Sequence, residues 1–174
     1  AALKGALVGT SVLAGGSSRS AQGAGALRPA AAAAVEAVAE PATVGFGAAD
    51  GPGWRAVRRI LVRNVSTRPL TVTIAAATEG VAGLSVRAEP ERVRLAPGRS
   101  TPVTLTATLT FLPRGLGAIQ GRARLEVGGG GRVVVPWAVA LPVQQSALIG
   151  GVSLSAKRFR ASDRSPAVLT VQAG

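Results

Sequence analysis

From about residue 43 onward, apolar and polar residues alternate along the chain with the period of two that is typical of half-buried β-strands. In one such run, Ile60 and Val62 alternate with Arg59 and Arg63. The clearest run covers residues 103–110, in which every second residue is a threonine. Further runs of this kind are Leu70–Ile74, Leu84–Arg87, Arg92–Leu95, Arg122–Val127 and the strongly apolar Arg132–Leu141. We expect each of them to form a strand.

Turn signals separate these runs, for example in the segment from Asn64 to Pro69. About seven short strands with a turn every 8–12 residues are typical of a β-sandwich of the immunoglobulin or fibronectin type III class. The sequence therefore predicts a mainly β chain containing such a sandwich. In the last run, Trp137 is the largest residue and is expected in the core, while Pro136 marks a bulge or an edge.

The first forty residues have a different pattern. Leu3, Ala6 and Leu7 are spaced as on one face of a helix, which suits the end of a buried helix. The glycine- and serine-rich stretch Val12–Gly25 is expected to be a surface loop. Pro29 fits the first position of a second helix over Ala30–Val38, which Pro41 would end.

Composition limits the chemistry that the 174 residues can perform. The chain has no cysteine and no histidine, so disulfides and thiol nucleophiles are excluded, and the usual ligands of transition metals are missing. We expect no cofactor and no metal. Because methionine is also absent and the chain begins with Ala1, we expect a fragment or a processed product.

The net charge of +12 raises nucleic acid as a partner, against the simpler alternative of a solvated basic surface. Two short basic clusters, Arg55–Arg59 and Lys157–Arg160, stand out, but most arginines are spread singly along predicted strands. We therefore expect no nucleic-acid partner. No window approaches the roughly 18 apolar residues of a membrane span, so none is expected.

Gly9-Thr10-Ser11 is the one stretch that resembles the surroundings of a serine nucleophile. A serine hydroxyl needs a neighbouring base, and no histidine is present to act as one. Lys4, seven residues earlier on the same helix, leaves a Ser–Lys dyad open in principle. Nothing else in the sequence supports such a dyad, and a hydroxyl at a helix C-terminus is the favoured explanation of Ser11. We assign no catalytic residue.

Three further short motifs each have an ordinary structural explanation. Gln22-Gly23-Ala24-Gly25 lacks the third glycine and the preceding strand of a dinucleotide-binding loop, so a tight turn is favoured. Asp50-Gly51-Pro52-Gly53 could bind calcium weakly, but turn chemistry accounts for it. Asn64-Val65-Ser66 matches the short glycosylation sequon.

The order of these segments resembles the C-terminal part of a subtilisin-like serine protease. Leu3–Ser11, Gln22–Gly25 and the alanine-rich stretch after Pro29 are similar to the last helix, glycine turn and closing helix of the subtilase catalytic domain. Ile60–Thr73 and Val93–Leu105 are similar to strands of the fibronectin type III-like domain that follows many such catalytic domains. Val133-Val134-Val135-Pro136-Trp137 is similar to that domain's last strand.

The resemblance implies three parts. Residues 1–41 would be the C-terminal helices of an incomplete catalytic domain, residues 42–143 a fibronectin type III-like sandwich, and residues 144–174 the start of a truncated β module. The chain would be a fragment of a secreted or cell-wall-associated bacterial endopeptidase. It would be inactive alone, with its triad upstream of Ala1. Its partners would be the upstream catalytic domain and, through the parent enzyme, polypeptide substrates. The alternative is a non-enzymatic bacterial surface module for adhesion or spacing. A third and weaker interpretation is a basic module that binds polyanions.

Overall fold

A computed structural model of the protein describes residues 2–13, 15, 22–77, 82–113, 117–142, 149–155, 158 and 168–173. The chain divides into two compact units, Ala1–Pro142 and Val143–Gly174. Among the residues that the structure describes, the first unit contains the helices α1 (Ala2–Gly9) and α3 (Pro29–Ala33). Its strands are β1 (Ala37–Glu40), β2 (Val44–Ala48), β3 (Arg55–Asn64), β4 (Leu70–Ala77), β5 (Leu84–Glu89), β6 (Arg92–Leu95), β7 (Ser100–Leu109), β8 (Ala118–Val127) and β9 (Gly131–Ala140).

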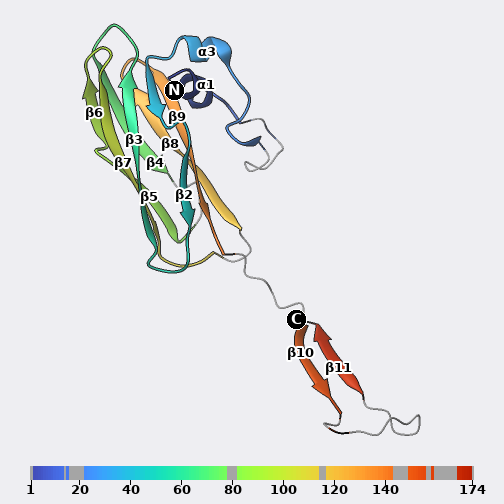
Figure 1. Ribbon diagram of the computed structural model, residues 1–174. Coiled ribbons are helices and arrows are strands. Elements are labelled where there is room, and N and C mark those ends of the chain that lie inside the picture. The colour runs from blue at the N-terminus through green and yellow to red at the C-terminus, as the bar shows by residue number, and fades with distance from the viewer. Residues whose placement is uncertain are drawn as a thin grey trace. The chain divides into compact units, whose positions relative to one another are not determined.

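These strands form two sheets that pack face to face (Figure 1). The first sheet has the order β1-β3-β7-β5, and the second has the order β2-β9-β8-β4-β6. All pairs are antiparallel except β2 with β9. The prediction of a mainly β chain with a sandwich is therefore confirmed.

The predicted alternation is also observed. Ile60 and Val62 point into the core and are fully buried, whereas Arg59 and Arg63 are exposed. Trp137 is only 2% exposed, so its predicted place in the core is confirmed. Pro136 precedes the point at which β2 begins to pair with β9, Val44 lying opposite Trp137. Pro136 is paired with Arg122 of β8 on one side, while on its other side the pairing with β2 has not yet begun. This position fits the prediction of an edge at Pro136.

Both open sides of the sandwich are closed by a segment that passes from one sheet to the other. On one side, β1 ends at Glu40, Pro41 follows, and the chain enters the second sheet as β2. On the other side, β5 ends at Glu89, Pro90 follows, and β6 joins the opposite sheet. All four edge strands are consequently short, which limits edge-to-edge association with other chains.

Helix α1 packs against β1 and β9 through small residues. Gly5, Ala6 and Gly9 are its buried positions. A Cβ atom at Gly5 would lie 2.9 Å from the Ala39 carbonyl oxygen, so the helix backbone lies almost directly on the strand. The predicted buried face was therefore wrong in one position: Leu3 is 73% exposed. The glycines allow a closer approach than leucine side chains would.

The second predicted helix is shorter than expected. It covers only Pro29–Ala33, whereas Ala37–Glu40 forms β1, so the helix predicted over Ala30–Val38 was wrong in its second half. A five-residue alanine helix is marginal by itself. Pairing of β1 with β3 places Ala37 and Ala39 in the core, which the helix could not do. The first strand of the sandwich accordingly lies within residues 1–41.

In the second unit, the residues that the structure describes form an antiparallel pair of strands, β10 (Ile149–Leu154) and β11 (Leu169–Ala173). Val152 lies opposite Val171 and Leu154 lies opposite Leu169, and all four side chains are exposed.

Candidate functional site

The hydroxyl groups at the end of α1 are engaged by the backbone. Thr10 Oγ1 donates to the Ala6 carbonyl oxygen at 2.8 Å. Ser11 Oγ lies 2.7 Å from the Val8 carbonyl oxygen and 2.5 Å from that of Ala24, and Ser11 is 4% exposed. This is the geometry of a hydroxyl at a helix C-terminus. Ser11 therefore holds the helix end against the glycine turn, while Lys4 is exposed to solvent.

The glycine turn itself fits closely against the chain that precedes it. Val12 and Ala26 form an antiparallel bridge, with their backbone hydrogen bonds at 3.1 and 2.8 Å. Gly25 has a φ of 106° and lies against the Val12 carbonyl, where no Cβ atom would fit. The Ala24 carbonyl also accepts a hydrogen bond of 3.0 Å from Arg122 on β8. The tight turn predicted for Gln22–Gly25 is what the structure contains.

Next to this turn, a shallow cavity of about 350 Å³ lies on the outer face of the second sheet. Its lining comes from the turn and from β2, β8 and β9, and includes Leu13, Ala24, Gly45, Gln120, Pro136 and Ala138. Most of these side chains are small and apolar. Among the described lining residues, Arg122 is the ionisable one, and its guanidinium donates to the Ala24 carbonyl oxygen. These residues include no carboxylate, so they do not form an acid–base pair or activate a nucleophile.

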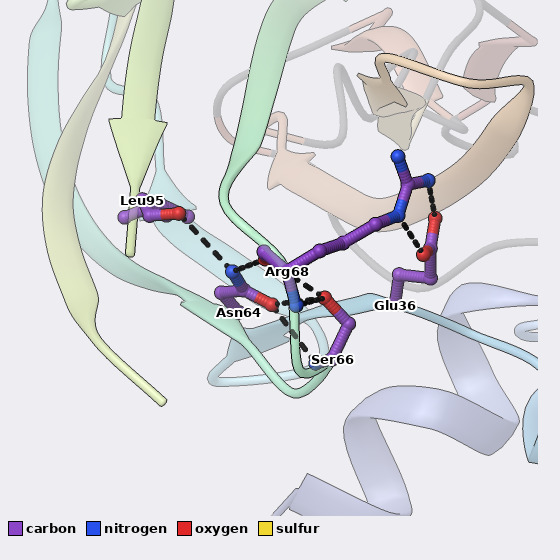
Figure 2. Close-up of polar contacts among 5 residues, drawn as sticks. All are labelled: Glu36, Asn64, Ser66, Arg68 and Leu95. Carbon is purple, nitrogen blue, oxygen red and sulfur yellow. Dashed lines mark hydrogen bonds and ion pairs between the residues drawn. The ribbon is translucent and has the colours of Figure 1, made fainter. Parts of the chain in front are cut away.

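A polar network joins the strands at one end of the sandwich, as Figure 2 shows. Asn64 is fully buried at the end of β3. Its Nδ2 donates to the carbonyl oxygens of Arg68 at 2.8 Å and Leu95 at 3.1 Å. Its Oδ1 accepts from the Ser66 backbone N–H and hydroxyl, both at 2.8 Å. All four hydrogen-bonding positions of the amide are thus used, so the sequon asparagine is not accessible in the folded chain.

Arg68 extends this network to the segment before β1. Its Nε and Nη2 each donate to a carboxylate oxygen of Glu36 at 2.8 Å, a two-point pairing (Figure 2). The hydrogen bond from Arg68 lowers the pKa of Glu36 below its ordinary value, and the positive charge acts in the same direction. The guanidinium also lies over Gly129, in the turn between β8 and β9. Both groups are partly exposed, so the pair fixes local geometry more than it adds stability.

Arg58 has a role that the sequence interpretation missed. Its Nε donates to the Gly45 carbonyl at 2.9 Å, and its Nη2 donates to the Phe46 carbonyl at 2.8 Å. A side chain from β3 of the first sheet thereby binds β2 of the second sheet. The alternation along β3 could have revealed this role. Arg58 is two residues from the buried Ile60 and therefore lies on the inward side of the strand, whereas the other arginines of β3 point outward.

The remaining candidates hold no reactive arrangement. Asp50–Gly53 forms a turn in which the Gly53 N–H donates to the Leu109 carbonyl at 2.8 Å. Of the basic cluster Lys157–Arg160, only Arg158 lies within the described residues, and it is exposed. In the part of the chain that the structure describes, acidic side chains do not gather in a group of three that could hold a metal. The helices of that part lack the length and apolar character needed to cross a membrane.

No protein-family model matches the chain, and a search of curated proteins gave no match. Among solved structures, it resembles PapD-like domain 7 of human CEP192, with 14% identity and a TM-score of 0.44 over 62% of this chain and 84% of that one. The E. coli chaperone DraB has 14% sequence identity and a TM-score of 0.47, and the match covers 61% of this chain and 55% of DraB. SSP-19, an MSP-domain protein like family member of Caenorhabditis elegans, has 13% sequence identity and a TM-score of 0.43, and the match covers 59% of this chain and 97% of SSP-19.

Proposed function

We propose that this chain is the accessory C-terminal part of a secreted subtilisin-like serine endopeptidase of a bacterium. The helical residues before β1 would end the catalytic domain, strands β1 to β9 would support that domain as a fibronectin type III-like sandwich, and residues 144–174 would begin a further β module. Hydrolysis of peptide bonds would be carried out by a triad upstream of Ala1. The role of the chain itself is structural.

The surface of α1 is the observation that supports this proposal. Lys4 is the one charged residue in the helix, and apolar or glycine residues occupy its other positions. A helix that is apolar all round is normally buried all round. Here one face lies on the sandwich, but Leu3 on another side is 73% exposed, and Leu27 after the glycine turn is 59% exposed. Such a surface suits a segment that a further domain of the same polypeptide covers.

The state of Ser11 fits the same proposal. Its hydroxyl is held between two backbone carbonyls and is nearly inaccessible. Because a nucleophilic serine needs a free hydroxyl and a neighbouring base, Ser11 would not react. A fluorophosphonate probe should therefore leave this chain unlabelled, and labelling at Ser11 would contradict a purely accessory role.

The decisive test is the reading frame upstream of Ala1. We expect it to encode, in order, an Asp-Thr-Gly, a His-Gly-Thr and a Gly-Thr-Ser-Met-Ala-x-Pro-His block. The full-length protein should then react with the fluorophosphonate and lose this reaction when the serine of the third block is replaced. An upstream sequence without these blocks would refute the protease proposal.

The second candidate is a non-enzymatic module of the bacterial surface, used for adhesion or spacing. One observation favours it: α1 packs on β1 and β9 and belongs to the same compact unit as the sandwich. In this case the helical segment at the start of the chain would cover the sandwich and would not belong to a catalytic domain. An upstream sequence made of further β-sandwich repeats would support this candidate over the protease.

A further inference from the structure

The outer face of the first sheet carries a group of outward-pointing arginines that we call the arginine face: Arg55, Arg59 and Arg63 on β3, and Arg87 on β5. All four are exposed. The three on β3 are each four residues apart, which at the rise of an extended strand separates them by about 13 Å. They therefore form a row along the strand, with Arg87 two strands away.

The strand between β3 and β5 contributes hydroxyl groups to this face. Thr104 of β7 lies opposite Arg59, and Thr108 lies opposite Arg55. Thr106 lies between Val57 on one side and Arg87 on the other. Directly paired residues share one side of a sheet. The alternating threonines of β7, which the sequence analysis singled out, thus run through the middle of the arginine face.

These arginines are not engaged within the protein. Arg58 and Arg68 show what an engaged arginine looks like here, since both make several hydrogen bonds of 2.8–2.9 Å. By contrast, the side chains of the four arginines of the arginine face make no hydrogen bond or ion pair with the residues that the structure describes. Glu89 of β5 and Glu40 of β1 are the acidic groups on this side, and each lies beside a neutral partner, Thr104 and Leu61 respectively. The face keeps a net positive charge.

We propose that the arginine face binds a linear polysaccharide that carries carboxylate groups, such as a polymer of uronic acids. Guanidinium groups pair with carboxylates at two points, and the threonine hydroxyls between them can exchange hydrogen bonds with sugar hydroxyls. A flat row of charges suits an extended polymer. This inference does not rest on the proposed protease function.

Nucleic acid fits the same face less well. The DNA major groove admits a helix or a two-stranded ribbon, but the arginine face spans β3, β7 and β5. Its described strands also present no aromatic side chain on which a base could stack.

The test is direct binding of polygalacturonate oligosaccharides to the full chain, measured by calorimetry at low salt, with dextran as the neutral polymer and duplex DNA as the competing polyanion. The triple variant Arg55→Gln/Arg59→Gln/Arg63→Gln should bind polygalacturonate roughly tenfold more weakly. The matched control Arg28→Gln/Arg92→Gln/Arg94→Gln removes the same charge from exposed positions elsewhere, and should change the affinity by less than about threefold.

Arg87→Gln, a single change on another strand, provides an independent check and should weaken binding a few-fold. It also keeps the proposal testable if the triple variant does not fold. Equal losses in the test and control triples would mean that only net charge matters and would overturn the proposal. Tighter binding of duplex DNA than of polygalacturonate, or equal binding of dextran, would overturn it as well.

Discussion

Gly121 of β8 lies directly opposite Trp137 of β9, and the indole ring occupies the space that a side chain at position 121 would fill. The ring is held there by an edge-to-face contact with Phe46, at 6.2 Å between centroids and 73° between planes. In a core made mainly of Val, Leu and Ile, the glycine is what allows one large aromatic residue to be accommodated. The two residues act as a single packing unit.

Gly121→Ala should therefore destabilise the sandwich by about 1–3 kcal/mol, because the added methyl overlaps the indole. Urea denaturation followed by tryptophan fluorescence measures this, since Trp54 and Trp137 are the chain's two tryptophans and both lie in the first unit. Gly45→Ala is the matched control, because open space surrounds that position, and it should leave the midpoint almost unchanged. Equal midpoints for Gly121→Ala and wild type would contradict this packing.

Asn64→Ala should cost at least about 1–3 kcal/mol of stability, since it removes the donor to the buried Leu95 carbonyl and the acceptor of the Ser66 backbone N–H. Asn64→Asp keeps the shape of the side chain but places a carboxylate against the carbonyl oxygens of Arg68 and Leu95, so it should be no less harmful. Ser66→Ala is the milder comparison, because the Ser66 backbone N–H still donates to Oδ1. Thermal unfolding of the three variants gives the order, and a larger loss for Ser66→Ala than for Asn64→Ala would refute this account.

The sequence predicted the long strands well because each has one buried and one exposed face. The stretch 103–110 shows this most clearly, and β7 covers most of it. Strand β1 could not be recognised in the same way, since Ala37, Val38 and Ala39 are all buried and show no alternation. The core lies on one side of β1 and the helices lie on the other. Its alanines therefore had the pattern of a helix.

The candidate site was less predictable, because it depends on pairing between distant strands. The sequence shows that Ser11 lacks a histidine, but not that a carbonyl at Ala24 would hold its hydroxyl. It shows arginines near residues 55–63, but not that Arg58 binds β2 while its neighbours stay free. The register of β3 with β7 brings arginines and threonines onto one face, and it pairs residues that are 37 (Arg63 with Ser100) to 53 (Arg55 with Thr108) positions apart.

The Glu36–Arg68 pair predicts a specific pH dependence. The pKa of Glu36 is lower in the folded chain than in the unfolded chain, chiefly because of the hydrogen bond from Arg68. The pair's contribution is therefore complete above the ordinary glutamate pKa of about 4.3, and is lost as the pH falls through the lower, folded value. Glu36→Gln should be less stable than wild type at pH 7, and this difference should vanish at strongly acidic pH.

Urea midpoints at several pH values and low salt measure this difference, which should also shrink in high salt because both groups are partly exposed. Arg68→Gln should remove the same pH-dependent difference, since it removes the cause of the lowered pKa. A stability gap between wild type and Glu36→Gln that stays constant from pH 7 to strongly acidic pH would show that the gap does not come from this ion pair.

Gly5→Ala provides a test in which packing and helix propensity act in opposite directions. Alanine favours a helix over glycine by roughly 1 kcal/mol, so propensity alone predicts a firmer α1. The new Cβ atom would lie 2.9 Å from the Ala39 carbonyl oxygen, a backbone atom that cannot move aside easily, so we expect α1 to be pushed off β1.

Amide hydrogen exchange measures this effect. In Gly5→Ala, exchange in residues 2–9 should become faster, while exchange in β7 and β8 stays slow. Leu3→Ala, at an exposed position of the same helix, should leave the exchange of α1 nearly unchanged. Slower exchange in Gly5→Ala would mean that the helix does not lie as closely on the strand as described.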